Sequence, residues 1–263
     1  MERAAFIRSL RLPRTTSQGD RSDYIPVRRG AIEPFAHLRP QFRGVDSAKA
    51  RRLLAAAAPF NPSKAEPLGR ALEVRDLTAL RSEAYARICH PLQGISRRSG
   101  DWEYQTWRDV LGDIPITAES SLRDLLPGEQ AKEFEIEPLI GSLGPKLAPT
   151  LADLIQKELT ESNAFFYFWE GLGGLRGASG AQLYSGPLRV VHSLHPYPDA
   201  LFESPTLWWS PKETWFIATH TDATSSYLGG PRALVRNLLA HPAVEAQEAS
   251  TTTVVDDWTA IPR

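Results

Sequence analysis

The stretch from residue 207 to residue 230 constrains the fold more than any other part of the chain. It holds three tryptophans, a run of β-branched and aromatic residues at 214–219 and a shorter strand-like run at 225–228. Two such runs joined by a short polar segment are typical of a β-hairpin. Gly230 and Pro231 then place a proline at the first turn of a helix that we expect to reach Leu239. The stretch predicts a core built on a sheet.

Strand and helix signals along the rest of the chain do not repeat as a βα unit. Their order predicts an α+β fold, with a mixed or antiparallel sheet and flanking helices, rather than a doubly wound parallel sheet. The expected strands are 83–90, 164–169, 181–184, 188–194 and 244–246, and the expected helices are 48–58, 106–111, 119–126 and 147–159. Two segments with no sustained period are expected to be loops, 92–100 and 127–146.

Composition divides the chain into three segments. Residues 1–60 are expected to form a basic, proline-rich extended arm with a short helix, residues 70–255 a single α+β body and residues 256–263 a tail. No apolar run approaches the roughly 20 residues of a membrane-spanning helix, and the first residues lack the apolar core of a secretory signal. The single cysteine, Cys89, excludes an internal disulfide. We therefore expect a cytoplasmic protein.

Positive charge is concentrated in the arm. The whole chain has a formal net charge of −1, but residues 1–60 hold twelve Arg and Lys residues against five acidic ones. The arm also carries Tyr24, Phe35 and Phe42, apolar anchors that a solvated linker does not need. We expect it to contact an acidic protein surface or nucleic acid, or to pair with the acidic remainder of the same chain.

Several short motifs between residues 83 and 249 resemble a set of actinobacterial proteins to which no activity is assigned. They are Glu83-Ala-Tyr-Ala-Arg-Ile-Cys-His-Pro91, Phe168-Trp-Glu-Gly171, Trp208-Trp209, Tyr227-Leu-Gly-Gly230 and Ala240-His-Pro-Ala-Val-Glu-Ala246. The resemblance covers about two thirds of the chain and implies a shared fold and residence inside the cell. One departure is His220, which stands where those proteins usually carry an acidic residue before the aspartate that matches Asp222.

Four residues form the best candidate metal site in the sequence. His192 and His195 are three residues apart, and His220 and Asp222 lie two apart, on one face of a strand. Two histidines and a carboxylate are a known ligand set for a transition metal. The alternative is that these histidines satisfy ordinary hydrogen bonds in the fold, and the sequence predicts no cofactor.

Candidates for other catalytic chemistry are few. Glu170 is a possible general acid because its apolar neighbours would raise its pKa, and His220 with Asp222 would complete a pocket. Cys89 and His90 are adjacent, so on a strand they point to opposite faces and do not form a nucleophile and base pair. No serine has the sequence context of a nucleophile elbow.

Trp208 and Trp209 point to a binding surface. Because neighbouring side chains on a strand face opposite ways, only one of the two indoles is expected to reach the core. The other is expected at the surface or in an interface, where tryptophan is enriched.

These features favour a protein-interaction or assembly module that contacts partners through its arm and its Trp-rich surface. The alternatives are a metal-dependent or hydrolytic enzyme that uses the His, Asp and Glu candidates, and a nucleic-acid-binding accessory protein. The expected partner is another protein or a second copy of the chain, with nucleic acid possible through the arm and no membrane.

Overall fold

The computed structural model describes residues 43–44, 71–77, 80–95, 102–125, 136–168, 183–193, 204–220 and 222–255. All of them belong to one of two compact units of the chain, Glu33–Arg263. The arm anchors Tyr24, Phe35 and Phe42 and the helix expected at 48–58 lie outside the described residues.

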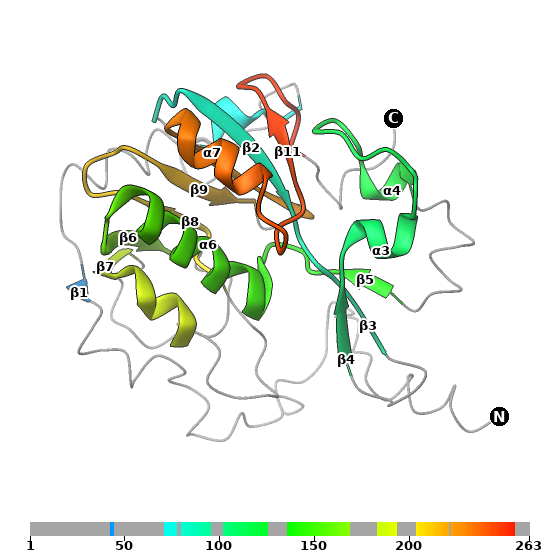
Figure 1. Cartoon of the computed structure of the whole chain (residues 1–263), viewed down its shortest axis with the longest axis horizontal. Helices are drawn as coiled ribbons and strands as arrows, with labels where there is room; N and C mark the ends of the chain where they lie inside the picture. Colours follow the sequence, from blue (N-terminus) through cyan, green and yellow to red (C-terminus); the bar gives the residue numbers. More distant parts are fainter. Residues whose placement is uncertain are drawn as a thin grey trace, which may run out of the picture. The chain divides into compact units, whose positions relative to one another are not determined.

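The main feature is an eight-stranded sheet in the order β1-β7-β6-β8-β9-β10-β2-β11 (Figure 1), and every neighbouring pair in it is antiparallel. Its strands are β1 (Arg43–Gly44), β2 (Ala84–Cys89), β6 (Asn163–Tyr167), β7 (Leu183–Pro187), β8 (Leu207–Trp209), β9 (Phe216–Thr219), β10 (Ser225–Gly230) and β11 (Ala246–Ala249). The expected α+β class with an antiparallel sheet is confirmed, including the hairpin of β9 and β10.

Two helices cover one face of this sheet. These are α6 (Gly144–Leu159) and α7 (Arg232–Leu239), which lie in front of the strands in Figure 1. Both helices are amphipathic, and their apolar residues pack on alternate strand residues such as Ala86, Ile88 and Leu228. The core of the molecule lies in this layer, where Trp208 packs edge-on against Trp215.

The opposite face of the sheet is also buried. Here Trp209, Phe216 and Tyr227 pack with Leu77 from the segment that follows η5 (Val74–Asp76) and with Val255 near the end of the described chain. A sheet that is covered on both faces accepts apolar side chains at every strand position.

The expectation that one of the two adjacent indoles is exposed is therefore wrong. Trp208 is 0% exposed and Trp209 is 1% exposed, each in the core of a different face of the sheet. Their alternation was predicted correctly, but the burial of the second face was not.

A second, three-stranded antiparallel sheet has the order β4-β3-β5. Its strands are β3 (Leu92–Ile95), β4 (Trp102–Gln105) and β5 (Ile136–Pro138), and Figure 1 shows β2 running on into β3. The chain continues from β4 into α3 (Trp107–Leu111), and α4 (Leu122–Leu125) follows after a loop. A third apolar cluster holds these parts together through Leu92, Trp107 and Leu122.

The small sheet corrects two loop predictions, since β3 falls within 92–100 and β5 within 127–146. Residues 188–193 form the 3-10 helix η7 instead of the expected strand. The helices expected at 106–111, 119–126 and 147–159 are confirmed as α3, α4 and α6, with shifted ends for α4 and α6.

Candidate functional site

The two sheets meet at His90, the first of two residues between β2 and β3. His90 is completely buried, and its backbone N–H donates to the Thr224 carbonyl at 2.9 Å. Its ring lies between both sheets, with Nδ1 2.7 Å from the Leu139 carbonyl oxygen and Nε2 2.8 Å from Ser226 Oγ. Ser226 Oγ is in turn 2.6 Å from Thr219 Oγ1. A continuous chain of polar groups therefore crosses β10 and β9 inside the core.

Burial determines the charge of this ring. Removal from water disfavours the charged imidazolium and lowers the pKa of His90 from 6.5 to about 3, and the nearby Arg87 charge acts in the same direction. The ring is neutral at pH 7, so only one nitrogen carries hydrogen. Because a carbonyl oxygen only accepts, Nδ1 donates to Leu139 and Nε2 accepts from the Ser226 hydroxyl.

The contact of Ser226 with His90 has the distance expected of a serine nucleophile and its base. Ser226 and Thr219 are, however, 0% exposed, and the second ring nitrogen is bound to a carbonyl rather than a carboxylate. The arrangement satisfies buried polar groups and holds two sheets together.

Arg87 lies on the other face of β2 and is also fully buried. Its Nε donates to Ser225 Oγ at 2.8 Å, and Nη1 lies within hydrogen-bonding reach of the carbonyl oxygens of Thr117, Ala118 and Ser120. The guanidinium carbon is 5.0 Å from the centre of the Trp107 ring, the geometry of a cation–π contact. Arg87 thus attaches the loop after α3 to the large sheet.

Glu245 holds the start of α3. Its two carboxylate oxygens accept from the backbone N–H groups of Trp107, at 2.6 Å, and Arg108, at 3.0 Å. Burial raises the pKa of Glu245, although these two hydrogen bonds and the Arg108 charge oppose the rise. Trp107 completes the connection because its Nε1 donates to the His90 carbonyl at 2.9 Å.

A cavity of about 200 Å³, which we call the junction cavity, opens beside these residues. It lies between the first turns of α6, the β2–β3 junction, the end of β4 and the segment before β11. Its lining includes Cys89, Tyr104, Lys146, Leu147, Thr150 and Glu245. The site therefore brings together one ammonium, one carboxylate, several hydroxyl groups and an apolar wall.

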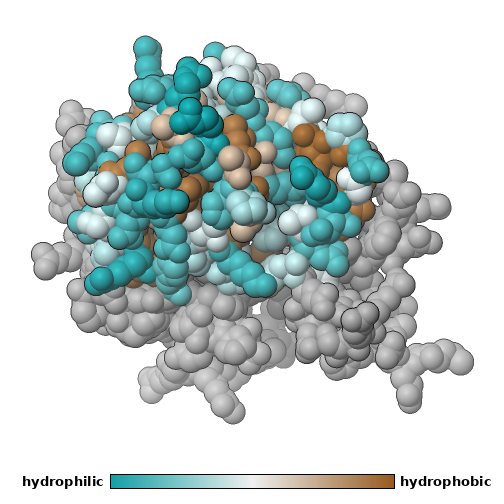
Figure 2. Space-filling model, in the orientation of Figure 1, coloured by the Kyte–Doolittle hydropathy of each residue, from teal (hydrophilic) through white to brown (hydrophobic). Residues whose placement is uncertain are grey.

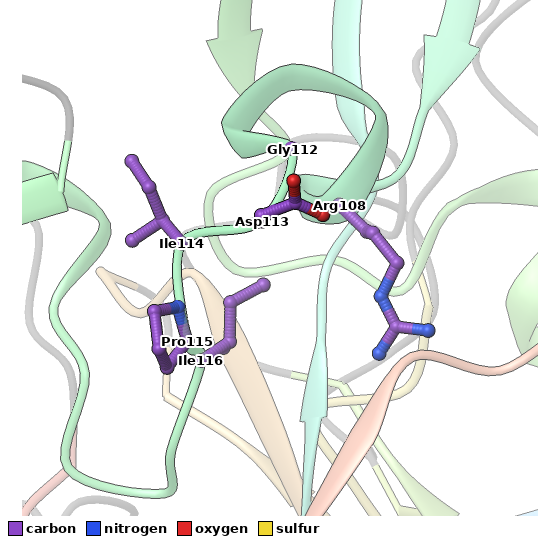
Figure 3. Close-up of a pocket in the computed structure, with 6 residues that line it drawn as sticks. All are labelled: Arg108, Gly112, Asp113, Ile114, Pro115 and Ile116. Carbon is purple, nitrogen blue, oxygen red and sulfur yellow. The ribbon is translucent and has the colours of Figure 1, made fainter.

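A second, more open hollow of about 370 Å³ lies at the C-terminal end of α3. It is lined by Arg108 and by the loop Gly112–Ile116, and we call these residues the α3-loop surface. Figure 3 shows the Arg108 guanidinium extending away from α3, while Ile114, Pro115 and Ile116 follow the loop on the other side. Ile114 is 45% exposed, although its side chain is apolar.

The three metal candidates that the structure describes make other contacts. His192 Nε2 is 2.7 Å from Asp153 Oδ1 at the surface, while His220 Nδ1 accepts from the Asp222 backbone N–H at 3.2 Å. Among the described residues, no three His, Cys, Asp or Glu side chains gather as a metal site would require. His195 and Glu170 lie outside the described residues.

Cys89 and His90 also stay apart, as strand alternation predicted. The Cys89 thiol is 3.5 Å from Gln247 Oε1, whereas the His90 ring bonds to Leu139 and Ser226.

Sequence reasoning missed Lys146 and the contacts of Glu245. The two residues are 99 positions apart in the sequence. Lys146 lies in a segment expected to be a loop, and Glu245 lies in a short motif near the end of the body. Arg87, His90 and Glu245 stand in the short motifs quoted above, but those motifs assign no role to them. Nothing in their spacing indicates that they meet around Trp107.

No helix in the described part of the chain is long and apolar enough to cross a bilayer. Comparison with protein-family models, curated proteins and solved structures finds no match to this chain.

Proposed function

We propose that this chain is a protein-interaction module that binds a second copy of itself through the α3-loop surface. The observation that carries the proposal is the exposed apolar loop. Gly112, Asp113, Ile114 and Pro115 are all exposed, and they border a hollow rather than a convex surface. Figure 2 shows hydrophobic residues among hydrophilic ones on the viewed face, so some apolar residues of this face are exposed to solvent.

The charges of this surface favour a second copy as the partner. Arg108 and Asp113 both line the hollow, and neither forms an ion pair with another described residue. In a two-fold symmetric dimer the same patch of both copies meets across the axis. Arg108 of each copy can then face Asp113 of the other. A patch with one cation, one anion and an apolar centre is complementary to itself.

The contact is expected to be weak. Stable interfaces bury about 800 Å² on each partner, and the α3-loop surface consists of only six residues. Such a patch fits a transient dimer that forms at high protein concentration or is reinforced by other segments. We propose residues 1–60 for that reinforcement, with Tyr24, Phe35 and Phe42 as their apolar contacts.

Sedimentation equilibrium over a wide concentration range tests the proposal. The wild-type chain is expected to show a concentration-dependent rise in mean mass, and Ile114→Ser is expected to weaken association by about tenfold, the equivalent of about 1.4 kcal/mol. Val254→Ser is the matched control, since Val254 is 48% exposed and lies outside the surface. Equal effects of the two variants, or a wild-type monomer at every concentration, would contradict the proposal.

A further inference from the structure

The junction cavity carries a second possible binding activity, which does not depend on the α3-loop surface. Its volume of about 200 Å³ is smaller than the pockets that take drug-sized ligands, which begin near 300 Å³. An occupant would therefore be smaller than a drug-sized ligand.

The two charged groups of the cavity have opposite signs and come from different elements. Lys146 belongs to the first turn of α6, and Glu245 stands immediately before β11. The ammonium of Lys146 is a donor for a ligand carboxylate. The Glu245 carboxylate accepts two backbone N–H groups, while a carboxylate has about four acceptor positions. It therefore keeps capacity for a ligand ammonium.

The remaining walls suit a short aliphatic group between these charges. Pro91, Leu147 and Ala243 supply apolar surface, and Thr150 and Tyr104 supply hydroxyl groups. Leu147 is also part of the main core, so this wall is fixed. A few polar groups placed around an apolar wall are typical of small-molecule sites.

We infer that the junction cavity binds a small zwitterion, an amino acid with a short aliphatic side chain, whose carboxylate contacts Lys146 and whose ammonium contacts Glu245. The partial burial of Glu245 supports this pairing, because a cation beside a partly desolvated carboxylate offsets the cost of that burial.

Calorimetric titration of the full chain with L-valine tests this inference. We expect a Kd of about 1 mM or tighter. Two fragments of valine each lack one charged group: isobutylamine has no carboxylate, and 3-methylbutanoate has no ammonium. Each is expected to bind at least about tenfold more weakly, because each loses a charge-assisted hydrogen bond.

Variants locate the binding. Lys146→Met is expected to weaken valine binding by about tenfold or more, and Lys157→Met, on the same helix but outside the cavity, is expected to leave it unchanged. Glu245→Gln should have the same effect as Lys146→Met. If Glu245→Gln fails to fold because α3 loses its contacts, the lysine variants and the two fragments still test the inference.

Three results would overturn the inference. They are no binding of valine at about ten times the expected Kd, binding of either fragment as tightly as valine, and unchanged binding by Lys146→Met. None of these bears on self-association, so the two proposals fail separately.

Discussion

The ring of His90 donates from Nδ1 to the carbonyl oxygen of Leu139 across 2.7 Å, and this single contact joins the end of β2 to the segment after β5. It is reinforced nearby by the Leu139 N–H, which donates to the Pro91 carbonyl at 3.1 Å. The two sheets are thus connected by hydrogen bonds around an imidazole that burial keeps neutral. These hydrogen bonds also position part of the wall of the junction cavity, because His90 and Pro91 both line it.

The first prediction concerns acid stability. The folded chain keeps His90 neutral down to a pKa of about 3, whereas the unfolded chain takes up a proton near pH 6.5. The unfolded state therefore binds more protons below pH 6.5, and stability is lost as pH falls from there towards 3. The loss from this group approaches about 1.4 kcal/mol per pH unit. Urea unfolding at several pH values measures it.

His241→Gln is the control for this prediction and should keep the wild-type pH dependence, whereas His90→Asn should flatten it. Should His90→Asn not fold, NMR of the wild-type ring decides, since its signals should not titrate above about pH 4. A ring that titrates near 6.5 in the folded chain would contradict the buried, neutral state.

The second prediction concerns Arg87. Its replacement by leucine leaves the carbonyl groups of the 117–120 loop without their buried donor, so we expect a loss of about 3 kcal/mol or more in the free energy of unfolding. Arg87→Lys should recover less than half of it, because an ammonium lacks the planar fork that reaches both Ser225 and the loop. Denaturant midpoints measure both variants. Full recovery by lysine would show that charge alone matters.

The third prediction concerns Gly229, which lies opposite Phe216 in the register of β10 and β9. A methyl group at Gly229 would come within 2.2 Å of Phe216 Cε1, so Gly229→Ala should destabilise the fold by about 1 to 3 kcal/mol or more. Phe216→Leu removes the ring edge. The double variant should therefore be less destabilised than the sum of the two single variants, as thermal unfolding would show. Strict additivity would mean that the ring is not the obstacle.

The fourth prediction compares two buried tryptophans. Trp107 Nε1 donates to the His90 carbonyl, whereas Trp208 Nε1 has no hydrogen-bond partner in the described structure. Replacement by phenylalanine removes the same atoms at both positions. We expect Trp107→Phe to cost about 1 to 3 kcal/mol more than Trp208→Phe, because it alone leaves a buried carbonyl unsatisfied. Equal unfolding midpoints for the two variants would contradict this assignment.

The sequence predicted those elements whose apolar pattern extends over many residues or whose residue types strongly favour one kind of secondary structure. The apolar spacing from Leu147 to Leu159 identified α6, and the alternation of 83–90 identified β2. It did not predict β3 and β5, since segments of three or four residues that include Gly94 and Pro138 carry too little pattern. Their strand state comes from pairing with each other, which is a tertiary effect.

The candidate sites were less predictable than the fold. Trp208 and Trp209 suggested an exposed indole only because burial on both faces of the sheet is not visible in a three-residue strand. Lys146 and Glu245 line the same cavity although they are 99 positions apart, an arrangement that no local pattern records. Histidine spacing suggested a metal site, but His192 contacts Asp153, His220 contacts the Asp222 backbone, and no three ligand-type side chains gather among the described residues.

The self-complementary charges of the α3-loop surface give the most direct test of the account. Arg108→Glu and Asp113→Lys each place like charges in contact across a symmetric dimer, so each variant alone is expected to be monomeric. Mixed in equal amounts, they restore both opposite-charge pairs, and sedimentation equilibrium of the mixture should recover much of the wild-type dimer fraction. A mixture that stays monomeric under conditions in which the wild-type chain associates would contradict the account.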